Sequence, residues 1–190
     1  ELVHTMFPFV RWLIHQPHLN HRPSHRGKVK GCCQDFFENL LKIELIDCVV
    51  PGADEILRLP NLRYLAMTKC SDVKLSKVEN NSIRYVNLAK VALPDWSWLG
   101  GLKKADILIL EDCGSIPSLK PLAHHPSLRG LWIAGKTKIE DGDLTVLDTL
   151  PGLQNLFIRD YPHYTHKSLI PWSWKRFQDR KSEEVLYKKK

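Results

Sequence analysis

The chain has 190 residues, a length typical of one domain, and 43% of them are hydrophobic. No run approaches the roughly eighteen apolar residues that indicate a transmembrane helix, and five cysteines do not make a secreted disulfide framework. The net charge of +7 comes from the ends, because residues 35–160 hold 15 Lys and Arg against 17 Asp and Glu. A continuous basic surface for nucleic acid is therefore not expected.

Residues 1–39 are predicted to form an N-terminal arm and cap. The segment from His4 to Lys28 holds Arg, His and Ser without acids, which fits either a flexible arm or an organelle transit peptide. Phe36 and Phe37 are expected to pack on the first structural unit. The adjacent Cys32 and Cys33 favour a reducing compartment, so a cytoplasmic protein is expected, with a mitochondrial location as the alternative.

The same arm contains a cluster of four histidines, His15, His18, His21 and His25, close to the cysteine pair. Zinc accepts such ligands. Two prolines between them interrupt any helical face that would align the rings. We therefore predict no metal and no other cofactor.

From residue 40 onward the chain repeats the pattern L-x-x-L-x-L-x-x-C. Copies ending in cysteine are Leu40–Cys48, Leu62–Cys70 and Ala105–Cys113, and copies without it are Ile83–Val91, Leu128–Lys136 and Leu153–Tyr161. The second apolar position of each copy recurs at steps of 22, 21, 22, 23 and 25 residues. One such unit cannot cover its own apolar ridge, so units of this period stack, each supplying a short strand and a return segment.

This pattern over residues 40–161 resembles the leucine-rich repeat family. The resemblance implies an α/β solenoid of about six coils with a parallel concave sheet, capped at both ends. Apolar residues at three- and four-residue spacing precede several strands, as in Ile56-Leu57 and Trp98-Leu99, and predict one or two helical turns on the convex side. The terminal cysteines are predicted to point into the core as small hydrophobic residues, without disulfide or catalytic roles.

Residues 162–190 are predicted to form a C-terminal cap and a basic tail. Tyr161, Tyr164 and the neighbouring histidines are expected to cover the apolar end of the stack. The combination of KIEDGDL with YPHYTHK resembles small bacterial leucine-rich repeat proteins, in which D-G-D-L precedes the last coil and H-Y-[ST]-H follows it. That resemblance implies a bacterial cytosolic origin and carries no activity.

We call the repeated apolar positions of each copy its anchors, and we expect them to be buried. In a solenoid, the residues that alternate with these anchors along the strand face the concave side. Many of them here are apolar or aromatic, and such contiguous surface marks interaction sites. The predicted partner-binding residues are Tyr64, Tyr85, Ile107, Ile109, Trp132 and Phe157 in an apolar band, with Lys69, Lys90, Glu111, Asp112 and Arg159 at its rim. Trp132 is expected at the centre, where small neighbours such as Gly130 would leave room for an incoming side chain. The alternative is that the N-terminal arm covers the band.

The sequence lacks a nucleophile with a partner base, a glycine-rich phosphate loop and a complete calcium loop. We therefore predict a protein that is not an enzyme. The expected function is a protein-binding module of the immunity or adaptor type, with no membrane contact and only weak binding of nucleic acid through the basic ends. The alternative is a structural subunit of an organellar or RNA-containing assembly, docked through its basic termini.

Overall fold

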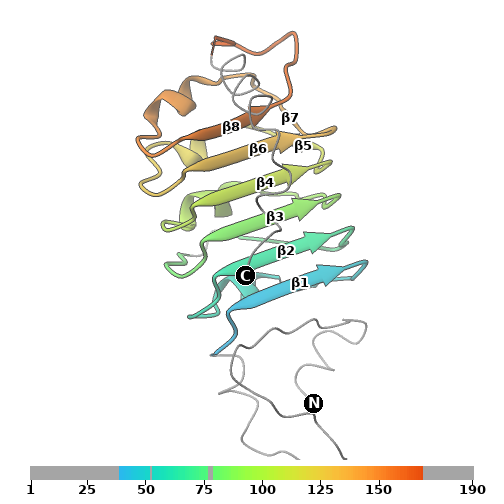
Figure 1. Ribbon diagram of the computed structural model, residues 1–190. Coiled ribbons are helices and arrows are strands. Elements are labelled where there is room, and N and C mark those ends of the chain that lie inside the picture. Colours follow the sequence, from blue (N-terminus) through green and yellow to red (C-terminus); the bar gives the residue numbers. More distant parts are fainter. Residues whose placement is uncertain (1–38, 52, 77–78, 169–190) are drawn as a thin grey trace, which may run out of the picture.

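The computed structural model describes residues 39–51, 53–76 and 79–168, so most of the predicted N-terminal arm and basic tail lies outside the described residues (Figure 1). The protein is α/β, with six parallel strands arranged in chain order. The main-sheet strands are β1 (Lys42–Ile46), β2 (Tyr64–Thr68), β3 (Tyr85–Ala89), β4 (Ile107–Glu111), β6 (Gly130–Ala134) and β8 (Asn155–Ile158). A second, two-stranded sheet pairs β5 (Ser115–Ile116) with β7 (Lys138–Ile139).

The predicted strand register is confirmed. Ile43 lies opposite Leu65, Leu65 opposite Val86, and the same row continues through the equivalent residues of the later strands. Along the strands, buried residues alternate with more exposed ones because successive side chains point to opposite faces; the exception is Gly130 in β6, which is buried. The aligned anchors therefore form one apolar face, and their neighbours form the opposite face, which we call the outer face.

Short helical turns cover the apolar face of the sheet, in the segments where the sequence predicts them. They are α3 (Asp54–Leu57) and three 3₁₀ helices, η1 (Ser97–Gly101), η2 (Lys120–Leu122) and η3 (Thr145–Thr149). Their buried residues join the strand anchors in one core. Prolines follow three of these turns at Pro60, Pro126 and Pro151, and each disfavours helix in the residue before it.

The predicted burial of the three repeat cysteines is confirmed, and all three thiols are free. The Cys70 Sγ donates to the Leu45 carbonyl at 3.5 Å, and the Cys113 Sγ donates to the Leu88 carbonyl at 3.2 Å. Burial raises the pKa of both thiols, which keeps the proton needed for donation. We call a main-sheet strand with its return segment one unit. Cys70 and Cys113 each tie their unit to the preceding strand, whereas the Cys48 Sγ donates to the Ile46 carbonyl of its own strand.

The predicted equivalence of Lys136 to these cysteines is wrong. Lys136 is exposed, whereas Thr137 is fully buried and its Oγ1 accepts a hydrogen bond from the Cys113 N–H at 2.9 Å. The Asp112 carboxylate accepts from the Lys136 N–H at 2.8 Å and holds this residue at the surface. An unpaired lysine in the core would also carry a large desolvation cost.

Candidate protein-binding surface

The outer face brings together the side chains that the sequence places in its columns. One row runs through Glu44, Ala66, Asn87, Ile109, Trp132 and Phe157, and the next runs through Lys42, Tyr64, Tyr85, Ile107, Gly130 and Asn155. All six residues of the predicted apolar band lie in these rows and are partly exposed. Neighbouring members stand one strand spacing apart, roughly 4.8 Å, which lets them form a continuous surface.

Aromatic stacking orders the part of this face that lies over β2 and β3. The rings of Tyr64 and Tyr85 stack with centroids 4.6 Å apart and an angle of 4° between their planes. The Lys42 ammonium lies 4.6 Å from the centre of the Tyr64 ring and 3.0 Å from the Glu44 carboxylate. A cation over an aromatic face is favourable, so this end of the surface is both aromatic and charged.

The Trp132 indole lies against Gly130, two residues earlier in β6. A Cβ built on Gly130 would stand 2.9 Å from Cη2 of the indole and closer still to Cζ3. The prediction that Gly130 leaves room for an incoming side chain is therefore wrong, because the indole itself fills that space and Gly130 is buried. A glycine inside a strand commonly marks such a close approach.

The charged residues at the rim differ in how strongly the protein holds them. Lys69 lies 3.8 Å from the Asp47 carboxylate, but both side chains are more than half exposed, so this ion pair contributes little to stability. The Arg159 guanidinium donates to the Gly135 carbonyl at 3.2 Å. Asp112 lies directly against Gly135, in addition to its bond with Lys136. Asp112 and Arg159 therefore have structural contacts of their own.

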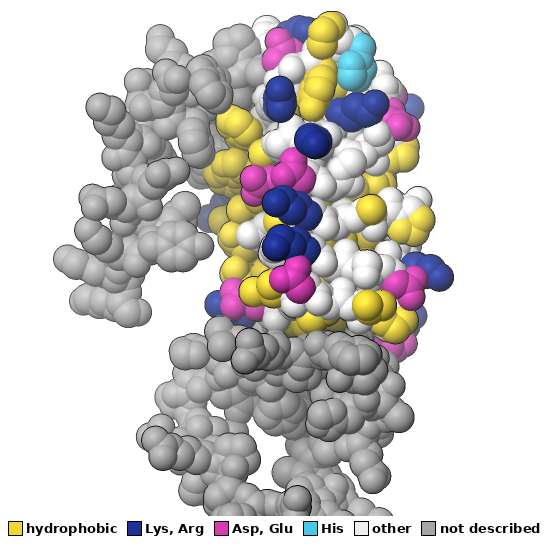
Figure 2. Space-filling model, turned by 90° about the vertical axis from the view of Figure 1, so that its right-hand side faces the viewer, with side chains coloured by type: hydrophobic (Ala, Val, Ile, Leu, Met, Phe, Trp, Pro, Cys, Tyr) yellow, Lys and Arg dark blue, Asp and Glu magenta, His cyan; other side chains and the backbone are white. Residues whose placement is uncertain are grey.

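Lys90 and Glu111 complete the predicted rim and are exposed. Figure 2 looks at the side where the main-sheet strands end and shows basic and acidic side chains in one row. The backbone explains this row: φ is positive at Asp47, Lys69, Lys90 and Asp112, each directly after its strand. The shared left-handed turn brings one charged residue from each of the first four units to the same edge.

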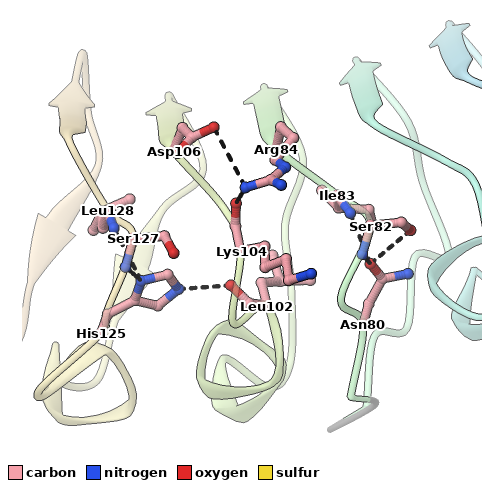
Figure 3. Close-up of polar contacts among 10 residues, drawn as sticks. All are labelled: Asn80, Ser82, Ile83, Arg84, Leu102, Lys104, Asp106, His125, Ser127 and Leu128. Carbon is pink, nitrogen blue, oxygen red and sulfur yellow. Dashed lines mark hydrogen bonds and ion pairs between the residues drawn. The ribbon is translucent and has the colours of Figure 1, made fainter.

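At the opposite edge, where the chain enters the strands, the structure reveals two buried polar side chains that the sequence analysis missed. Asn80 is 5% exposed, and its Oδ1 accepts hydrogen bonds from the N–H groups of Ser82 and Ile83, both at 2.8 Å (Figure 3). Its Nδ2 donates to the Leu57 carbonyl at 2.6 Å. Asn80 therefore fixes the chain as it approaches β3.

His125 occupies the equivalent place before β6 and is 4% exposed. Its Nδ1 accepts from the N–H groups of Ser127 at 3.3 Å and Leu128 at 3.1 Å, and its Nε2 lies 2.6 Å from the Leu102 carbonyl (Figure 3). Asn80 and His125 both stand three residues before the first anchor of their copy, where the other units have Leu59, Leu102 and Leu150. A polar residue in a leucine position was the available sequence signal.

The two C-terminal motifs contact each other. The Tyr164 hydroxyl accepts from the Ile139 N–H at 2.8 Å, and the His163 Nε2 donates to the Ile139 carbonyl at 2.7 Å. The Thr165 N–H donates to the Gly142 carbonyl at 2.8 Å. Tyr164 is buried in the core. Side chains from YPHYTH thus occupy the hydrogen-bonding positions beside β7 that a further strand would fill.

Within residues 39–51, 53–76 and 79–168, no three His, Cys, Asp or Glu side chains gather in a way that could hold a metal ion. The histidine cluster from His15 to His25 lies outside the described residues. In the same described part of the chain, no helix is long and apolar enough to cross a membrane.

No model of a known protein family matches this chain. Searches of curated proteins and of solved structures likewise give no match. The surface geometry and the repeat pattern are therefore the grounds on which a function can be proposed.

Proposed function

We propose that the chain is a leucine-rich repeat solenoid that acts as a non-catalytic protein-binding module, with the outer face as its binding surface. The repeat pattern and the strand register support the solenoid, because equivalent positions of successive copies lie side by side. The observation that carries the function is the cluster of partly exposed apolar side chains on β4, β6 and β8. Its members are Ile107, Ile109, Trp132 and Phe157.

A sheet face that only meets water normally carries polar side chains in these positions. Here the row through Ile109, Trp132 and Phe157 is apolar over three adjacent strands. Large aromatic side chains at the centre of such a patch dominate the binding energy of protein interfaces. The contact of Trp132 with Gly130 also restricts the ring before a partner arrives, which reduces the entropy lost on binding.

Charge around the cluster supplies orientation. Lys69 and Lys90 extend from the ends of β2 and β3, whereas Glu111 and Asp112 extend from the end of β4. Charges that change sign along one edge of a patch, basic at β2 and β3 and acidic at β4, favour one docking orientation and raise the association rate more than the affinity. A partner with the reverse arrangement of charge fits this rim.

The experiment is an affinity pull-down with quantitative mass spectrometry on three versions of the protein: wild type, Trp132→Ala and Val49→Ala. Val49 is an apolar residue, 52% exposed, outside the main-sheet strands, so it serves as the matched control. A specific partner is expected with wild type and Val49→Ala and depleted with Trp132→Ala, while circular dichroism shows equal folding. Equal recovery by all three versions contradicts the proposed surface.

The three free buried thiols fit a reducing compartment, and on that basis we propose the cytoplasm, with the mitochondrion as the alternative. The immunity or adaptor role stays a prediction. So does the structural-subunit alternative, which the charge distribution favours: residues 2–34 hold five Lys and Arg with no acid, and residues 161–190 hold eight against three acids. Co-sedimentation with a large particle that disappears after ribonuclease treatment would support that alternative.

A further inference from the structure

His125 is held in its neutral form by the hydrogen bonds that it makes. Its Nδ1 faces two backbone donors, the N–H groups of Ser127 and Leu128, so this nitrogen must accept and cannot carry a proton. The proton of the neutral ring therefore sits on Nε2, which donates to the Leu102 carbonyl at 2.6 Å. A proton added at Nδ1 would leave three N–H donors, those of Nδ1, Ser127 and Leu128, facing one another with no acceptor.

The surroundings of the ring agree with this assignment. Burial lowers the pKa of His125 because a charged ring would lose its hydration, and the nearby Lys103 adds to this effect. The bond to the Leu102 carbonyl and the charge of Asp106 act in the opposite direction, more weakly than burial. These groups belong to the preceding unit, and the adjacent His124 is exposed on the segment of His125 itself.

Asn80 shows that the hydrogen bonding at this place does not require a titratable group. Its amide accepts from the N–H groups two and three residues later and donates to a carbonyl of the preceding unit, as the His125 ring does. The two side chains therefore do the same structural work at the entries to β3 and β6. Only the side chain before β6 can take up a proton as the pH falls.

We propose that His125 is a pH-sensitive latch, which holds the chain at the entry to β6 while the ring is neutral and releases it when the ring is protonated. Protonation removes the acceptor for two N–H groups and places a charge in a buried position. The released segment leads directly into β6, the strand that carries Trp132 and Gly130. The latch itself does not depend on the proposed function.

The direction of the pH effect follows from linkage. The unfolded chain takes up the proton with a pKa of about 6.5, and the folded chain takes it up at lower pH. The stabilisation by His125 is therefore complete above about pH 6.5 and is lost as the pH falls from there towards the folded pKa. In this interval, unfolding of the protein takes up as much as one extra proton.

His125→Asn is the matched variant, since asparagine can make the Asn80 set of bonds without titrating. The unfolding equilibrium constant of the full chain is measured by urea denaturation at intervals between pH 7.5 and pH 5. Below about pH 6.5, the wild-type constant should rise more steeply than that of His125→Asn, by up to about tenfold per pH unit for one proton. Equal pH slopes for the two proteins would overturn the proposal.

A second measurement covers the case in which His125→Asn fails to fold. In the wild-type protein, the proton on the ring carbon between the two nitrogens of His125 is followed by NMR as the pH is lowered. At pH 6, its chemical shift should still be that of the neutral ring. Half-protonation of the ring at about pH 6.5, the value of a free histidine, would contradict the latch.

Discussion

Replacing Tyr164 with Phe isolates the hydrogen bond that closes the β7 edge. Phenylalanine keeps the aromatic ring in the core, where it packs edge-on against His163 at 4.7 Å between ring centres, and removes only the hydroxyl. That hydroxyl is the acceptor for the Ile139 N–H, and Ile139 is 0% exposed, so water cannot replace it. A buried donor left without a partner costs about 1–3 kcal/mol.

Urea denaturation of Tyr164→Phe gives the magnitude. If the dependence of the unfolding free energy on urea is about 2 kcal/mol per molar, a loss of about 2 kcal/mol lowers the midpoint by about 1 M. Tyr161→Phe is the control, because the Tyr161 hydroxyl lies 3.5 Å from the Gly135 carbonyl and its side chain is only partly buried. The control should change the unfolding free energy by about 0.5 kcal/mol or less.

Amide hydrogen exchange at Ile139 reports on the same bond directly. The Ile139 amide should exchange faster in Tyr164→Phe than in wild type, and it should keep its protection in Tyr161→Phe. The reasoning is refuted if Tyr164→Phe has the wild-type midpoint and an equally protected Ile139 amide.

Three further outcomes are expected. Leu108→Ala should lower the unfolding free energy by about 2–5 kcal/mol, because Leu108 is a buried anchor of the central strand β4; a change below about 0.5 kcal/mol in urea denaturation would remove it from the core. The three buried cysteines should resist alkylation at neutral pH until urea unfolds the chain, and rapid labelling of all three in the native protein would contradict their burial. Gly130→Ala should push the Trp132 indole off β6 and increase the quenching of its fluorescence by acrylamide, while the unfolding free energy changes by about 1 kcal/mol or less. The fluorescence of Trp132 is obtained as the difference from Trp132→Phe. Unchanged quenching would show that the ring does not lie on Gly130.

The strand register could be predicted because it depends on a local rule. Alternation along a strand and the spacing between copies place Leu65 beside Ile43 and Leu131 beside Leu108, without knowledge of any distant contact. The buried cysteines follow from the same rule, since each occupies the equivalent position in its copy. Short-range pattern was sufficient for the architecture of the sheet.

The errors arose where a contact between neighbouring units decides the local geometry. Lys136 was aligned with the buried cysteines because the pattern counts residues, whereas the Asp112 carboxylate, 24 residues earlier, holds the Lys136 backbone at the surface. The indole of Trp132 could lie either away from Gly130 or across it, and the pattern does not specify a side-chain rotamer. The missing Cβ of Gly130 makes the second position possible.

The polar residues at the strand entries were missed for a related reason. Asn80 and His125 stand where leucine is expected. They stabilise the fold through hydrogen bonds to backbone groups, and a pattern of side chains does not represent those groups. The contact of Tyr164 with Ile139 spans 25 residues, so the two C-terminal motifs could be recognised separately without their hydrogen bonds being predicted. Backbone partners of buried polar groups require the folded structure.

The most direct test of the proposed binding surface measures two free energies on one variant, Trp132→Ala. Once the partner is isolated, calorimetry gives its affinity for wild type and variant, and urea denaturation gives their unfolding free energies. The account predicts that binding weakens by about 2 kcal/mol or more, roughly thirtyfold, while the unfolding free energy changes by about 1 kcal/mol or less. Wild-type affinity in Trp132→Ala would move the binding site away from the outer face of the sheet.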